Sequence, residues 1–191
     1  MIAEIAILTK STMRGAYCIA GLNINTGKWM RLVRDAEGNP LTPMYGNCEP
    51  HDVVKVEVES VPLRNQTENC RVIFGTMQKA GTWNIDDVVR LHPPERHEYV
   101  FGNNSPSLSA DEMQRYNFNY SLMLIKADRM NINGGRAAFT YNGRDYHNMR
   151  VTDPYYEGIN AGLGNAYIVV SMPSSPYRGA AYGKFAAKVF P

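Results

Sequence analysis

Trp29 and Arg31 stand two residues apart in segment 14–33, RGAYCIAGLNINTGKWMRLV. In an extended strand, side chains at this spacing project from the same face, so the indole ring lies beside the guanidinium. A ring next to a guanidinium suits a planar, anionic ligand such as a nucleotide, whose base stacks while its phosphate pairs. The alternative is that Trp29 caps a second small core and Arg31 extends over it.

The same segment predicts a β-hairpin with two unlike faces. Asn25-Thr26-Gly27 fits a three-residue turn in which Gly27 takes the left-handed conformation. This turn pairs Leu22 with Met30 and Gly21 with Arg31, so that Gly21 leaves room over the backbone. The expected core face carries Cys18, Ala20, Leu22, Ile24, Met30 and Leu32. The expected ligand face carries Tyr17, Gly21, Asn23, Trp29 and Arg31, where Tyr17 and Trp29 would stack.

Further polar residues are candidate contacts for the same ligand. Arg14 would hold phosphate together with Arg31. The polar turn that contains Gln66, Glu68 and Asn69 would form a rim over the groove. The alternative for this turn is that its side chains satisfy the backbone of the loop.

Basic residues in the last third of the chain offer two more sites. Lys184 and Lys188 share one face of the last predicted strand, where they would contact phosphate or protect a strand edge. A second group surrounds the Asn142-Gly143 turn, namely Arg136, Tyr141, Arg144, Tyr146 and His147. Basic residues interleaved with aromatic rings suit single-stranded nucleic acid, and solvated decoration of a hairpin is the alternative.

The residue pattern favours neither an enzyme nor a metalloprotein. Cys18 falls on the expected core face, where a thiol is inert. The four histidines have no metal-ligand spacing, and no glycine group precedes a Lys-Ser/Thr pair. We therefore expect no catalytic residues, no metal site and no cofactor. A nucleotide-processing enzyme whose acidic residues cannot be placed is the least favoured hypothesis.

Composition limits the partners and the compartment. A net charge of +2 is too small to hold duplex DNA by charge alone, although it permits a local basic groove. No apolar run approaches the roughly 18 residues of a membrane helix, and the N-terminus MIAEIAILTK lacks the pattern of a signal peptide. Three cysteines without metal spacing predict free thiols and a reduced, cytoplasmic setting.

Strand-like segments occupy both ends of the chain and helical segments the middle. Asn84 is a candidate N-cap for a helix over 83–91, and Ser109 with Glu112 forms a capping box for a helix that ends near Tyr116. We expect a mainly β protein with two OB-like, partly open barrels joined by a short helical connector. The expected parts are a barrel over 1–78, the connector over 79–116 and a barrel over 117–191.

The order of short motifs resembles the prokaryotic dual OB-containing domain family. The motifs are Cys18-Ile19-Ala20-Gly21, Thr26-Gly27-Lys28-Trp29-Met30-Arg31, Gln66-Thr67-Glu68-Asn69, Ile168-Val169-Val170-Ser171-Met172 and Tyr182-Gly183-Lys184-Phe185-Ala186-Ala187. The resemblance implies two fused OB folds without an established enzyme activity. It also implies binding of nucleic acid or nucleotides, often in a prokaryotic conflict system.

Two functional hypotheses follow. The first is a non-enzymatic binding module for single-stranded nucleic acid or a nucleotide. The second is a protein-interaction or scaffold module that uses the same aromatic face.

Overall fold

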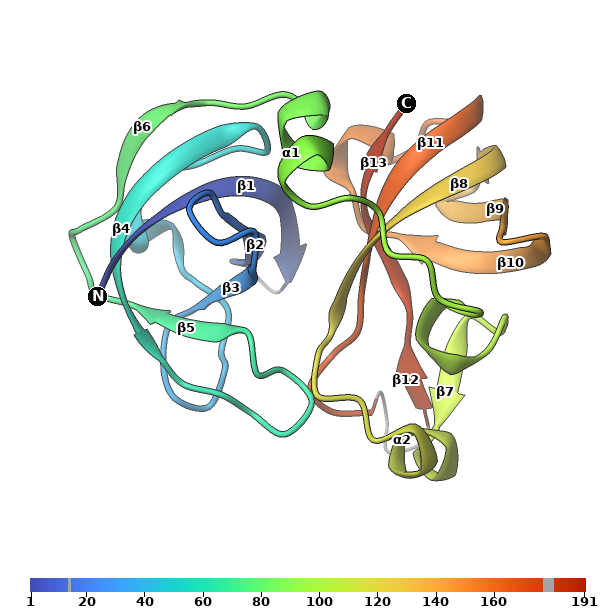
Figure 1. The fold of residues 1–191 in the computed structure, drawn as a ribbon, viewed down its shortest axis with the longest axis horizontal. Coiled ribbons are helices and arrows are strands. Elements are labelled where there is room, and N and C mark those ends of the chain that lie inside the picture. The colour runs from blue at the N-terminus through green and yellow to red at the C-terminus, as the bar shows by residue number, and fades with distance from the viewer. Residues whose placement is uncertain (14, 177–180) are drawn as a thin grey trace. The chain divides into compact units, whose positions relative to one another are not determined.

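The computed structural model describes residues 1–13, 15–176 and 181–191, so Arg14 lies outside the described residues. The chain divides into two compact units, Met1–Pro93 and Pro94–Pro191 (Figure 1). The expected connector over 79–116 does not stand apart, because helix α1 (Ile85–Leu91) belongs to the first unit and helix α2 (Ala110–Tyr116) to the second.

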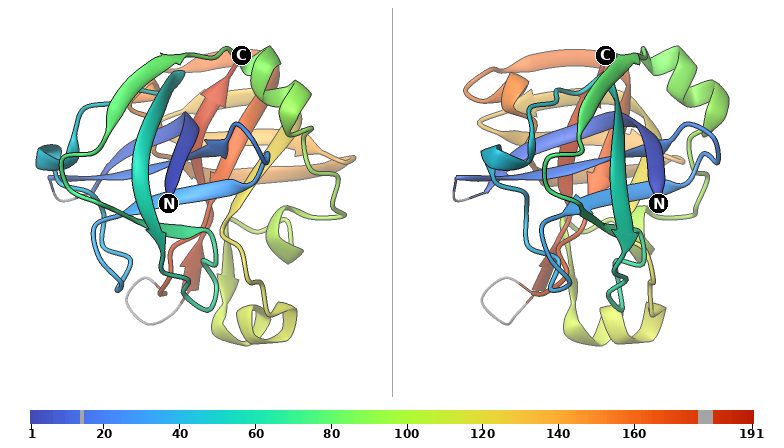
Figure 2. Two further views of the ribbon diagram at one scale, coloured as in Figure 1. Left: turned by 60° about the vertical axis from the view of Figure 1, so that its left-hand side comes forward. Right: turned by 90° about the vertical axis from the view of Figure 1, so that its left-hand side faces the viewer.

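The first unit is a ring of five strands with one strand added. Its strands are β1 (Ile2–Met13), β2 (Ala16–Asn23), β3 (Trp29–Val33), β4 (Asp52–Ser60), β5 (Asn69–Val72) and β6 (Gln78–Thr82). They are ordered β1-β2-β3-β5-β4-β6, and a pairing of β1 with β4 closes the ring. The pair β3–β5 is parallel. The turned views show how these strands curve around their core (Figure 2).

The second unit contains a closed barrel of the same topology. Its strands are β8 (Leu122–Asn133), β9 (Arg136–Tyr141), β10 (Arg144–Val151), β11 (Ala161–Ser171) and β13 (Phe185–Phe190). The order around the barrel is β10-β13-β11-β8-β9, and β10 and β13 are parallel. When the five ring strands of each unit are numbered 1 to 5 along the chain, both units have the same circular order, 1-2-3-5-4. The fold repeats although the sequence shows no exact repeat.

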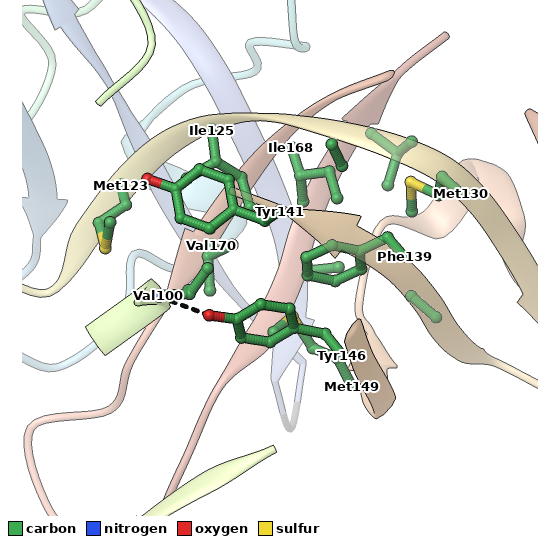
Figure 3. Packing of buried hydrophobic residues seen from close by; sticks show 14 of the residues in the cluster. Val100, Met123, Ile125, Met130, Phe139, Tyr141, Tyr146, Met149, Ile168 and Val170 are labelled. Atoms are coloured by element: carbon green, nitrogen blue, oxygen red, sulfur yellow. Dashed lines mark hydrogen bonds between the residues drawn. The ribbon is translucent and has the colours of Figure 1, made fainter. Parts of the chain in front are cut away.

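Aromatic rings pack with aliphatic side chains and methionines in the core of the second barrel (Figure 3). Phe139 and Tyr146 stack with ring centroids 5.0 Å apart and planes 3° from parallel. The Tyr146 hydroxyl accepts a hydrogen bond of 3.0 Å from the Val100 amide, and the Tyr141 hydroxyl donates one of 2.8 Å to the Glu95 carbonyl. Both tyrosines are thus core residues, which corrects their exposed position in both alternatives that the sequence left open, nucleic-acid contact and solvated decoration of the hairpin.

The mainly β architecture is confirmed, as are both helix caps. The Asn84 side chain accepts from the Asp87 amide, and Ser109 and Glu112 exchange both bonds of a capping box. The second barrel is closed rather than partly open. Strand β6 and the small sheet of β7 (Ser107–Ser109) and β12 (Ala181–Gly183) were not predicted, because these short strands lack an apolar alternation. The remaining elements are short 3-10 turns at Pro43–Tyr45, Val100–Gly102 and Pro154–Tyr156.

Candidate nucleic-acid interface

The register of the β2–β3 hairpin differs by one residue from the expected one. Gly27 has the predicted positive φ of 66°. The loop, however, contains four residues, because the Asn23 amide donates to the Lys28 carbonyl at 3.0 Å. The Asn23 side chain holds this longer loop by accepting from the amides of Asn25 and Thr26. Gly21 therefore lies opposite Met30, and Ala20 lies opposite Arg31.

This shift exchanges the two faces of β2. Ile19 now shares the core with Met30 and Leu32, and Tyr17 packs against the same core. The Lys10 ammonium lies 4.5 Å from the centroid of the Tyr17 ring. Tyr17 and Trp29 project from opposite faces, so the expected pair of stacking rings on one face is wrong.

Trp29 and Arg31 do share a face, as expected, but that face is not an open platform. Ala20, Leu22 and Val33 on the same face are buried. The indole of Trp29 is half-buried and meets the ring of His92 edge-on, with centroids 5.5 Å apart. His92 in turn places its Nδ1 atom 2.9 Å from the Gly27 carbonyl oxygen.

Arg31, Gln66, Glu68 and Asn69 come together, as the sequence suggested, but they form a buried cluster. Parallel pairing of β3 and β5 sets Arg31 beside Asn69, and the Arg31 amide donates to the Glu68 carbonyl at 2.9 Å. The Arg31 and Glu68 side chains are 11% and 6% exposed, with Nε and Oε1 3.8 Å apart. Asn69 donates to the Gln66 side chain at 3.3 Å. Burial lowers the pKa of the Arg31 guanidinium, and the Glu68 carboxylate opposes this shift.

This cluster joins β5 to β3 through buried polar contacts. A buried ion pair that loses one partner leaves an uncompensated charge, which destabilises the fold. The geometry therefore favours the interpretation in which these side chains support the loop and the strand pairing. Their role as ligand contacts stays a prediction.

Lys184 is buried instead of lying on an exposed strand face, which corrects its expected position. It is 1% exposed and precedes β13. Its ammonium donates to the Val100 carbonyl at 2.6 Å, the Asn103 carbonyl at 2.7 Å and Asn103 Oδ1 at 2.6 Å. These three bonds use all three of its donors. Burial lowers the pKa of Lys184 to about 7, while Glu112 acts in the opposite direction.

This buried ammonium predicts a rise in stability with pH. An unfolded lysine keeps its proton up to about pH 10.4, whereas Lys184 in the fold releases it at about 7. Between these values the unfolded chain binds more protons, so the free energy of unfolding increases with pH, by at most about 1.4 kcal/mol per unit.

The measurement is urea unfolding of the native protein and of Lys184→Met at several pH values in that window. We expect the native chain to gain stability relative to the variant as pH rises, since all other titrations cancel in the difference. If the difference in unfolding free energy between the native protein and Lys184→Met stays constant or falls as pH rises, the three oxygens hold the proton on Lys184 throughout this range.

The exposed surface of the second barrel carries a pair of arginines that sequence reasoning did not bring together. Arg136 and Arg150 lie directly opposite each other in the β9–β10 pairing, and both are exposed. Arg136 donates to the Asn148 carbonyl at 3.2 Å. Among the described residues, neither guanidinium forms an ion pair. Strands β9 and β10 are the orange ribbons at the right of Figure 1.

Small and polar side chains surround this pair on the outer surface of β8, β9 and β10. Asn133 pairs with Arg136 on one side, and the half-buried Ala138 pairs with Asn131. We call the outward residues at this end of the three strands the arginine face, which consists of Asn131, Asn133, Arg136, Ala138, His147 and Arg150. Nearer the Asn142-Gly143 turn, the same strands carry the exposed carboxylates of Asp128 and Asp145. Beyond it, Arg129 is neutralised by Asp145 at 3.4 Å. The uncompensated positive charge therefore lies at Arg136 and Arg150.

The thiols are free, as predicted. Cys18, Cys48 and Cys70 form no disulfide. Burial raises the pKa of Cys48 and of Cys70 to about 11, and it also raises the pKa of Cys18. Thiols with raised pKa values are poor nucleophiles at neutral pH.

The repeated five-strand topology agrees with the comparison of the chain with known families. The model of the dual OB-containing domain matches residues 3–189. The chain belongs to the dual OB-containing domain family. No curated protein and no solved structure matches this member of the family. Among the described residues, no helix is long and apolar enough to span a membrane.

Proposed function

We propose that this dual OB protein binds single-stranded nucleic acid or a nucleotide through the arginine face. The observation that carries the proposal is the exposed Arg136–Arg150 pair, which has no carboxylate partner among the described residues. Two like charges directly opposite each other repel and destabilise a sheet. An anion bound between Arg136 and Arg150 would remove this repulsion. The guanidinium fork also matches the oxygens of a phosphate group.

The position of the pair in the barrel supports the same proposal. OB folds commonly bind oligonucleotides on the face of their second and third strands. In the second unit these strands are β9 and β10, which carry Arg136 and Arg150. Ala138 adds little bulk to the surface, and the side-chain amides of Asn131 and Asn133 offer donors and acceptors for base edges. The prokaryotic conflict-system setting stays a prediction of the family resemblance.

The test compares two double variants that remove the same charge. Arg136→Ala with Arg150→Ala removes both guanidiniums of the arginine face. Arg96→Ala with Arg115→Ala removes two exposed arginines elsewhere in the second unit. Fluorescence anisotropy with a single strand of about ten nucleotides, ended by hydroxyl groups, measures affinity across salt concentrations. For two lost phosphate contacts we expect the salt slope to fall by about 1.4 in the first variant only.

Trp29→Ala separates this proposal from the site expected in the first unit. A ring that stacks on a base contributes roughly 1–3 kcal/mol of affinity. The arginine-face proposal predicts unchanged affinity for Trp29→Ala. Loss of affinity in Trp29→Ala, with unchanged affinity in the Arg136/Arg150 variant and native melting points in both, would place the site in the first unit.

The absence of binding would overturn the proposed function. If no single strand or nucleotide binds the native protein more tightly than about 10⁻⁴ M at physiological salt, the proposal is wrong. The protein-interaction hypothesis would then replace it.

A further inference from the structure

We infer that the Arg136–Arg150 pair holds a terminal phosphate group, that is, a phosphomonoester on the end of a strand or on a nucleotide. The inference rests on the proposed function and names the group that its site prefers. It is drawn from the register of the two arginines, their free donors and their place at one end of the face.

The two guanidiniums are close enough to bind the same phosphate group. Residues directly opposite in an antiparallel pair have Cα atoms roughly 5 Å apart, so Arg136 and Arg150 reach the same volume above the sheet. Arg136 uses Nη1 to bond the Asn148 carbonyl at 3.2 Å, which anchors its side chain. The Arg150 side chain has no hydrogen bond among the described residues. Most of the ten N–H donors that two arginines possess, at about five each, remain available to a ligand.

Charge matching selects the kind of phosphate. A phosphodiester within a strand carries one negative charge, and its two free oxygens are satisfied by a single guanidinium fork. A phosphomonoester carries a charge of about −1.5 to −2 and three free oxygens, so it engages two forks at once. It also neutralises both members of the pair and removes the repulsion between them.

The place of the pair suits the end of a strand. Arg136 is the first residue of β9 and Arg150 the penultimate residue of β10, so both lie at the end of the hairpin that is remote from its Asn142-Gly143 turn. The neighbouring turn that joins β8 to β9 is Gly134-Gly135, and a Cβ at either glycine would meet no atom within 4 Å. Since neither glycine carries a side chain, the turn itself adds no bulk beside the arginines. A phosphate held there lets the attached nucleotides run along the face toward Ala138.

The experiment measures binding of one oligonucleotide sequence in three forms, with a 5′-phosphate, with a 3′-phosphate, or with hydroxyl groups at both ends. We expect one phosphorylated form to bind the native protein about tenfold more tightly than the hydroxyl form, and the favoured end identifies the source of the phosphate. Inorganic phosphate and a nucleoside monophosphate serve as competitors. The Arg96/Arg115 double variant is expected to keep the preference.

A charge-conserving variant tests the fork itself. Arg136→Lys with Arg150→Lys retains both positive charges but loses the bidentate geometry. We expect it to bind the hydroxyl-ended strand nearly as well as the native protein and to lose the preference for the phosphorylated form. A native melting point ensures that the loss concerns the site.

The outcomes separate the inference from the proposed function. If the hydroxyl-ended strand binds at the arginine face and a phosphate at neither end tightens it, the inference is overturned and the proposed function stands. If only the nucleoside monophosphate binds, and the lysine variant abolishes this binding, the inference stands and strand binding is wrong. If neither ligand binds, both are overturned.

Discussion

Replacing Gly21 by alanine is expected to lower the free energy of unfolding by about 3 kcal/mol or more. A Cβ at this position would lie 2.1 Å from the Ala6 carbonyl oxygen and 2.8 Å from the Ala6 carbonyl carbon. These are backbone atoms of β1, so no side-chain rotation relieves the overlap. Strand β1 would have to move away from β2, beside the bulge at Ile7 and Thr9 where the two strands already change register.

Gly81→Ala is the matched control in the same unit. A Cβ at Gly81 meets no atom within 4 Å, and β6 is exposed along its whole length. We expect its unfolding free energy to stay within about 0.5 kcal/mol of the native value. Urea unfolding of the two variants measures the difference. Equal stabilities would mean that β1 accommodates the methyl group freely and that the close approach at Gly21 is not essential.

Gly21 also shows why the local sequence gave the wrong register and the wrong surroundings for the face of Trp29 and Arg31. Its missing side chain was interpreted as room for a ligand over Arg31, whereas it makes room for the backbone of β1. The hairpin pattern contains no information on which strand lies against β2. The expected turn of three residues was also one residue too short, because the Asn23 side chain stabilises a loop of four. A shift of one residue moves every side chain of a strand to the other face.

The arginine face was missed for a related reason. The two-residue turn Asn142-Gly143 was recognised, and regular pairing from it would set Arg136 opposite Met149. A bulge between Tyr146 and Met149, where Asn148 has a φ of 60°, adds one residue and brings Arg150 opposite Arg136 instead. Strand positions, helix caps and the two-barrel fold follow from local patterns of apolar residues and caps. Bulges and burial depend on partners that are distant in the sequence.

Lys184→Met is expected to lower the free energy of unfolding by about 3 kcal/mol near pH 7, and by more at higher pH, where the cost of burying the charge no longer opposes the native fold. The native ammonium satisfies the Val100 carbonyl, the Asn103 carbonyl and Asn103 Oδ1, and the first of these lies 84 residues away in the sequence. Methionine fills a similar volume but donates no hydrogen bond. Buried acceptors that lose a charged donor cost about 1.5–3 kcal/mol each, less what relaxation recovers.

The loop that Lys184 holds is itself strained, so it is expected to change conformation when the ammonium is removed. Phe101 lies between the two bonded residues with a positive φ of 48°, a conformation that costs a non-glycine residue energy and persists only where the surrounding structure enforces it. Asn103 passes the restraint on to helix α2, because its side chain donates to Glu112 at 2.9 Å. Removing the ammonium therefore releases a loop that is anchored at both ends.

Lys126→Met provides the control, since Lys126 is an exposed residue of β8 in the same unit. We expect Lys126→Met to change the unfolding free energy by no more than about 0.5 kcal/mol. Amide hydrogen exchange should show faster exchange at Val100 and Asn103 in Lys184→Met and native protection in the β8–β11 pairing. If Lys184→Met is as stable as the control, an apolar side chain replaces the buried ion without loss, as happens for some buried ion pairs. The three short bonds would then determine the conformation of the loop without contributing to the stability of the barrel.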